Sequence, residues 1–155
     1  MRSLAFLLGP LVLAASTLGF APAPIYKGNG RAPGSVLKRL QGTWTVSRYE
    51  ISGQNLLPAG EDYIVRIEKG QWTFSRKGAT PPKTNTYTLK LDPKAKPAAV
   101  DFVRDKTCLA LGAYALEGDT WKIVFRAADG TKKERARDLA TPGPGDYYLQ
   151  LERKR

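Results

Sequence analysis

Apolar and polar side chains alternate with a period of two along most of the chain from Gly42 onward, in short runs separated by turn residues. This alternation is typical of half-buried β-strands, because successive side chains of a strand point to opposite faces of the sheet. It predicts eight strands, around residues 44–46, 63–67, 72–74, 87–91, 100–102, 109–116, 121–126 and 147–151.

Turn residues between these runs predict hairpins. Lys69-Gly70 separates the second and third runs, and Gly118-Asp119 separates the sixth and seventh. Glycine suits such two-residue turns because it adopts a positive φ at little steric cost. Asp92-Pro93 ends the fourth run, since proline cannot donate to a ladder of backbone hydrogen bonds.

The strand count and the connections predict an all-β fold. The runs are short enough for antiparallel pairing, and no long helix lies between them to connect parallel strands. We expect an antiparallel up-and-down barrel of about eight strands, because closure removes exposed sheet edges. Val36, Leu37 and Leu40 predict a short helical turn before the first strand, and Glu134 to Ala140, which lacks Gly and Pro, is compatible with another before the last.

The first 35 residues do not belong to this pattern. Arg2 followed by the apolar stretch Leu4 to Phe20 resembles an export signal, and Pro10 argues against a retained membrane anchor. We expect a signal peptide over residues 1–21, a flexible Gly/Pro-rich spacer over 22–35 and the barrel domain over 36–155, with the mature protein in the periplasm or outside the cell.

The charge balance adds a second hypothesis about partners. The chain has 25 Lys and Arg against 14 Asp and Glu, a net charge of +11, and loss of a leader containing Arg2 leaves +10. Such a charge favours anionic polymers or headgroups, whereas export makes nucleic acid an unexpected partner. The candidate contacts with an anionic surface are Lys132, Lys133, Arg135, Arg137, Arg153, Lys154 and Arg155, although solvated loop and terminal charges are the simpler interpretation.

The residue types needed for most catalysis are missing. The sequence contains no histidine, and Cys108 is its only cysteine, so neither a Cys/His metal site nor an intramolecular disulfide is available. The carboxylate pairs Asp101 with Asp105 and Glu117 with Asp119 lie beside predicted turns, where acidic residues are ordinary. We therefore expect no enzyme, no catalytic residues, no metal and no cofactor.

Large aromatic side chains are the remaining candidates for a binding site. At strand spacing they face the barrel interior, where they either fill the core or line a ligand cavity, because about eight strands leave room for either. The barrel-facing candidates are Trp44, Tyr63, Trp72, Phe74, Tyr87, Phe102, Tyr114, Trp121 and Phe125.

Several short motifs carry a family resemblance. They are Leu40-Gln41-Gly42-Thr43-Trp44, Leu91-Asp92-Pro93, Lys96-Pro97, Val100-Asp101, the run from Gly112 to Ile123, and Leu149 to Arg153. The first resembles the Gly-x-Trp start of lipocalins, and the ordered set resembles a small lipocalin-like domain family of planctomycete-type bacteria. The resemblance implies a lipocalin-like barrel, export and a cation–π contact between Arg153 and Trp44, but no biochemical activity. The chain departs from that family at Val124 and in the more basic run Lys132 to Arg137.

Two functions follow as hypotheses. The first is an exported noncatalytic binding module for a small apolar molecule or an envelope partner. The alternative is a structural or interaction protein that adheres to anionic cell-surface material through its basic surface.

Overall fold

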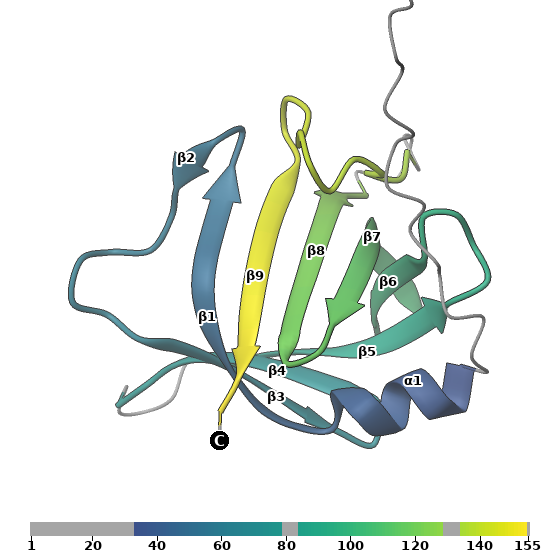
Figure 1. The fold of residues 1–155 in the computed structure, drawn as a ribbon, viewed down its shortest axis with the longest axis horizontal. Coiled ribbons are helices and arrows are strands. Elements are labelled where there is room, and N and C mark those ends of the chain that lie inside the picture. Colours follow the sequence, from purple (N-terminus) through teal and green to yellow (C-terminus); the bar gives the residue numbers. More distant parts are fainter. Residues whose placement is uncertain (1–32, 79–83, 129–133, 155) are drawn as a thin grey trace, which may run out of the picture.

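A computed structural model describes residues 33–78, 84–128 and 134–154 (Figure 1). The predicted signal peptide and most of the predicted spacer lie outside these residues. The elements in chain order are α1 (Pro33–Leu40), β1 (Gly42–Ile51), β2 (Gln54–Asn55), β3 (Tyr63–Glu68), β4 (Gln71–Arg76), β5 (Thr84–Asp92), β6 (Ala99–Arg104), β7 (Thr107–Glu117), β8 (Thr120–Ala127) and β9 (Tyr147–Arg153).

The strands form one closed antiparallel barrel. From β3 to β9 each strand pairs with the next in sequence, β1 pairs with β3, and β9 returns to pair with β1. These eight strands confirm the predicted all-β up-and-down barrel. The one strand outside the barrel, β2, pairs only with the end of β1. It was not predicted, because its two polar residues show no alternation.

The predicted hairpin turns are confirmed. Glu68 pairs with Gln71 across Lys69 and Gly70, which have φ values of 50° and 84°. Glu117 pairs with Thr120 across the second turn, where Gly118 has a φ of 57°. In both turns a glycine takes the positive φ that the right-handed twist of the two strands requires.

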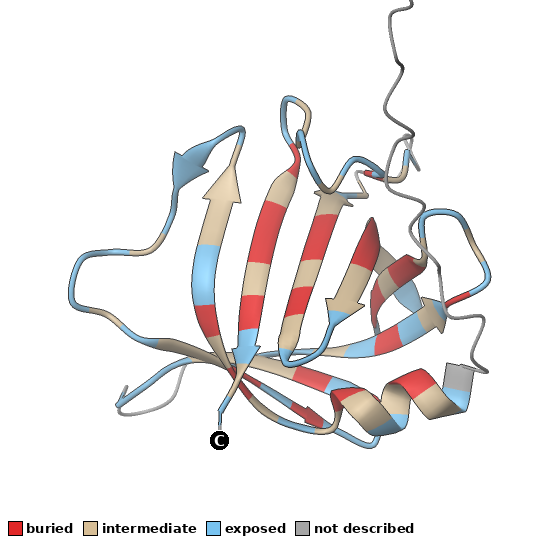
Figure 2. Cartoon of the chain, in the orientation of Figure 1, coloured by how far each residue is buried: buried red, intermediate tan, exposed pale blue. Residues whose placement is uncertain are grey.

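The barrel interior follows from the alternation. Figure 2 shows buried bands separated by less buried positions along β8 and β9, as expected for strands with one face toward the core. Ten of the largest core side chains are almost completely buried, and they include Trp44, Trp121, Leu40, Ile67 and Leu151. Burial of this apolar surface is the main stabilising contribution to the fold.

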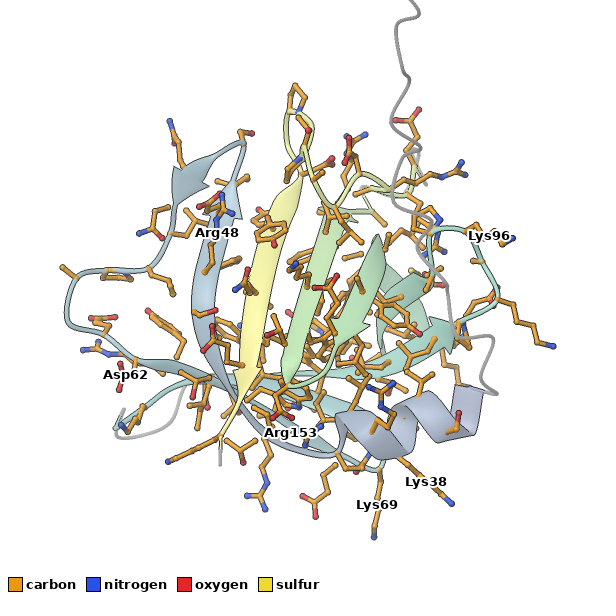
Figure 3. The ribbon with its side chains drawn as sticks, in the orientation of Figure 1. Lys38, Arg48, Asp62, Lys69, Lys96 and Arg153 are labelled. Atoms are coloured by element: carbon orange, nitrogen blue, oxygen red, sulfur yellow. The ribbon has the colours of Figure 1, made fainter. Side chains whose placement is uncertain are left out.

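One end of the barrel is closed by α1. The helix begins at Pro33, inside the predicted spacer, and buries Val36 and Leu40 against the core. The indole Nε1–H of Trp44 donates a hydrogen bond to the Leu40 carbonyl at 2.8 Å, which attaches the helix to β1. The charged side chains of α1 and the β3–β4 turn face outward here, as Lys38 and Lys69 show in Figure 3. We call this the closed end.

The helix considered before the last strand does not form. Residues 134–140 lie along the outer wall without regular secondary structure, where Ala136 is 3% exposed and packs on Ala113 and Val124. Ion pairs and hydrogen bonds of its side chains hold the segment against the barrel. Arg126 pairs with Glu134 at 3.1 Å and with the buried Asp146 at 2.7 Å. Contacts with the barrel wall therefore override the local helix propensity.

Within the described ranges, no helix has the length and apolar character needed to cross a bilayer.

Candidate ligand-binding cavity

We call the end of the barrel opposite α1 the mouth. A cavity occupies the barrel interior at this end. Its volume is about 280 Å³. It is lined by Tyr49, Trp72, Phe74, Asn85, Tyr87, Phe102, Leu109, Ala110, Phe125, Ala127, Tyr147 and Leu149. The interior is thus divided into a packed half near α1 and a hollow half near the mouth.

The structure separates the nine predicted barrel-facing aromatics into three groups. Those that line the cavity are Trp72, Phe74, Tyr87, Phe102 and Phe125. Trp44, Trp121 and Tyr114 are buried in the packed half instead, with Trp44 and Trp121 in ring contact at 5.8 Å. Tyr63 is not a lining residue, but its ring stacks on that of Phe74 with the centroids 5.4 Å apart, and its hydroxyl donates a hydrogen bond to Glu61.

Seven lining residues were not among the predicted candidates, namely Tyr49, Asn85, Leu109, Ala110, Ala127, Tyr147 and Leu149. Two of them, Tyr49 and Leu109, lie at irregularities in the strands. Strict alternation from Trp44 and Val46 places Arg48 inside and Tyr49 outside. The register of β1 with β9 shifts between Val46 and Arg48, and this shift brings Tyr49 to the inner face. A second shift, between β6 and β7, leaves Leu109 without a partner on β6 and turns it toward the cavity. Nothing in the alternation of apolar residues signals either bulge.

The aromatic rings form a rigid wall around the cavity. Phe125 and Tyr147 stack with their centroids 5.1 Å apart and an interplanar angle of 8°. Trp72 meets Phe102 edge to face at 5.3 Å and 87°. Such offset-stacked and edge-to-face contacts are the favoured arrangements of aromatic pairs. The cavity therefore presents fixed ring faces and edges to an occupant.

The polar groups of the cavity are neutral. No lining residue carries a charge, and the polar side chains are Asn85 and the three tyrosines. Burial raises the pKa of the Tyr49 hydroxyl, and the neighbouring Tyr147, Tyr87 and Tyr63 raise it further. The raised pKa favours the protonated form of the Tyr49 phenol, which is able to donate a hydrogen bond.

Charged side chains surround the mouth rather than the cavity. Arg76, at the end of β4, pairs with Glu61 at 2.9 Å, and Lys77 pairs with Asp62 at 3.0 Å. Arg104, at the end of β6, is exposed, and its guanidinium carbon lies 5.7 Å from the centroid of the Tyr87 ring.

Of the predicted anionic-surface residues that the structure describes, two are engaged by the barrel itself and two are exposed. Arg153 is held at the closed end, and Arg135 pairs with Asp101 at 2.6 Å while donating to the carbonyls of Val100 and Gly112. Arg137 and Lys154 are exposed. Lys132, Lys133 and Arg155 lie outside the described residues.

Groups for other chemistry are sparse in the described segments. They contain no cluster of three His, Cys, Asp or Glu side chains able to hold a metal. Cys108 is half-buried rather than fully buried, and its thiol lies 3.5 Å from the Ala110 carbonyl.

Comparison of the chain with models of protein families, with curated proteins and with solved structures gave no match. The resemblance to the small lipocalin-like family therefore stays a prediction.

Proposed function

We propose that this protein is an exported, noncatalytic binding protein that holds one small, largely apolar molecule in the cavity at the mouth of its barrel. The observation that carries the proposal is the cavity itself, because a barrel that served only as a scaffold has no need of a hollow, aromatic-lined half. Small-molecule sites are typically concave and mostly apolar, with a few polar groups that orient the ligand.

The cavity volume limits the size of the ligand. Drug-sized molecules occupy pockets of roughly 300 to 1,000 Å³, so 280 Å³ lies at the lower edge of that range. An engineered apolar cavity of about 150 Å³ binds benzene. The volume therefore suits a molecule of about two fused rings.

The alternative, adhesion to anionic cell-surface material, has less support. Arg135 and Arg153 are engaged by carboxylates and backbone carbonyls of the barrel itself. Their charges therefore stabilise the fold and are poorly placed to meet an external polymer.

Two measurements test the binding function. Native mass spectrometry of protein purified without denaturation should show a mass increment from a retained small molecule. Calorimetric titration should then show one site for 2-naphthamide, a neutral two-ring probe, on protein freed of that molecule.

A matched pair of variants locates the binding site. Ala110 lines the cavity, so Ala110→Phe should fill it and abolish binding of 2-naphthamide. Ala115 is in the same strand, five residues farther along and outside the cavity, so Ala115→Phe should leave binding within about twofold. No retained molecule together with no binding of the probe would overturn the proposal, and so would equal binding by both variants.

A further inference from the structure

The mouth of the barrel contains an arginine at an inward-facing strand position. Phe102 lines the cavity, and Arg104 is two residues farther along β6, toward the mouth. Because side chains two apart share one face of a strand, Arg104 lies on the cavity side of β6. Its contact with the ring of Tyr87, another lining residue, agrees with this placement.

Arg104, like Lys106 in the adjoining turn, has no anionic partner within the described residues, whereas other basic residues around the mouth do. Arg76, Lys77 and Arg126 each pair with a carboxylate at 3.0 Å or less. Within the described part of the chain, the guanidinium of Arg104 makes neither an ion pair nor a hydrogen bond. It makes a cation–π contact with the ring of Tyr87.

Arg153, at the opposite end of the barrel, is an arginine whose contacts stabilise the fold, and it provides a comparison for Arg104. It also lies over an aromatic ring, that of Trp44, but it donates to the carbonyls of Gln41 and Arg39 as well. A guanidinium has five N–H donors in a planar fork that matches a carboxylate. In Arg153 these donors serve the fold, whereas Arg104 is exposed and lies next to the lining residue Tyr87.

We propose that the ligand is a small planar aromatic anion, with its rings in the cavity and its anionic group at the mouth beside Arg104. This inference rests on the proposed binding function and names the chemical class of the ligand. The uncharged lining suits the rings, because a buried charge without a partner would be strongly disfavoured there. At the mouth the anionic group keeps part of its hydration and gains a charge-assisted hydrogen bond.

The tyrosine hydroxyls support the same orientation. Tyr49, Tyr87 and Tyr147 line the cavity, and a phenolic O–H is a hydrogen-bond donor. An anionic group that loses part of its hydration needs such hydrogen-bond donors to replace the lost water molecules.

The experiment compares probes that differ only in charge. 2-Naphthoate and 2-naphthamide have the same shape and number of heavy atoms, but only the naphthoate is anionic at neutral pH. Calorimetric titration of the purified protein should show that 2-naphthoate binds about five- to tenfold more tightly, the range for a partly exposed ion pair with charge-assisted hydrogen bonds. Raising the salt concentration should reduce this preference by screening.

Variants of Arg104 assign the preference to this side chain. Arg104→Gln should abolish the preference for naphthoate and leave binding of the amide within about twofold, whereas Arg104→Lys should retain part of it. Arg66→Gln is the matched control, because Arg66 is exposed on β3 and its loss changes the net charge equally.

Three outcomes overturn the proposal and are distinguishable from one another. If the amide binds as tightly as the naphthoate, the ligand class is wrong although cavity binding stands. If Arg104→Gln and Arg66→Gln weaken naphthoate binding equally, general positive charge rather than Arg104 is responsible. If neither probe binds and native protein carries no small molecule, the proposed function fails as well.

Discussion

The guanidinium of Arg153 lies over the indole of Trp44, with its central carbon 4.4 Å from the ring centroid. The two residues come from the last and first strands of the domain, and they pair with each other across the seam that closes the barrel. Arg153 also donates to the Gln41 carbonyl at 3.0 Å, so one side chain links β9, β1 and the residue after α1. Figure 3 shows Arg153 at this closed end. The predicted cation–π contact is thereby confirmed.

Trp44→Ala should lower the free energy of unfolding by about 3 to 5 kcal/mol, the usual cost of truncating a large buried aromatic. Trp44 is fully buried, and its loss also removes the hydrogen bond to Leu40. Chemical denaturation provides the measurement. Lys38→Ala, at an exposed position of α1, should change stability by less than about 0.5 kcal/mol. Similar small effects for both variants would mean that Trp44 does not close the core.

Arg153→Gln should cost about 2 to 3 kcal/mol, because it removes the cation over Trp44 and leaves two backbone carbonyls without their donor. Arg153→Lys should recover part of this loss, since an ammonium keeps the charge but not the planar fork. Urea denaturation of both variants is the test, with Lys154→Gln as the exposed control. An Arg153→Gln protein as stable as the control would contradict a structural role.

Gly112→Ala should destabilise the barrel by about 3 kcal/mol or more. A Cβ atom at Gly112 would lie 2.2 Å from the Val124 carbonyl oxygen, a backbone atom of the neighbouring strand that cannot move aside cheaply. Gly34→Ala is the matched control, since nothing lies within 4 Å of its Cβ position in α1. That change should stabilise the protein by up to about 1 kcal/mol through helix propensity. Thermal denaturation of the two variants measures this contrast. Equal stabilities of Gly112→Ala and Gly34→Ala would contradict the prediction.

Tyr114 should make the protein sensitive to alkaline pH. Burial, with a smaller contribution from the nearby Asp92 and an opposing one from Arg39, raises the pKa of its hydroxyl to about 12. The unfolded chain releases this proton near pH 10, so the folded state binds more protons between about pH 10 and 12. Stability should therefore be unaffected below pH 10 and fall by up to about 2 to 3 kcal/mol as pH rises toward 12.

Tyr114→Phe isolates this contribution from the other groups that titrate in alkali. Within the described residues the buried hydroxyl of Tyr114 has no hydrogen-bond partner, so its removal should leave stability at neutral pH unchanged or higher by about 1 kcal/mol. The stability difference between the variant and the wild type should then widen above pH 10. Parallel pH profiles for the two proteins would show that Tyr114 titrates normally.

The eight strands of the barrel, the hairpin turns and the barrel class follow from the local sequence alone. Alternation along Tyr63, Val65 and Ile67, or Tyr147, Leu149 and Leu151, fixes which side chains share a face, because that orientation depends only on the local backbone. A turn such as Gly118-Asp119 is local in the same way.

Only the tertiary structure decided which half of the interior is hollow. Trp121 and Phe125 share one face of β8, yet Trp121 packs in the core and Phe125 lines the cavity. The difference depends on which side chains the other strands place opposite them. It also depends on α1, which covers one end of the barrel and leaves the other open.

The tertiary structure also decided the roles of residues near irregular strands and on the outer wall. Tyr49 reaches the cavity because the register of β1 with β9 shifts at a bulge, and residues 134–140 do not form a helix because Ala136 and Arg135 contact the barrel wall. Each of these partners is distant in sequence. Pairings of this kind are settled by the packing of the whole barrel, so the local pattern of apolar and polar residues does not contain them.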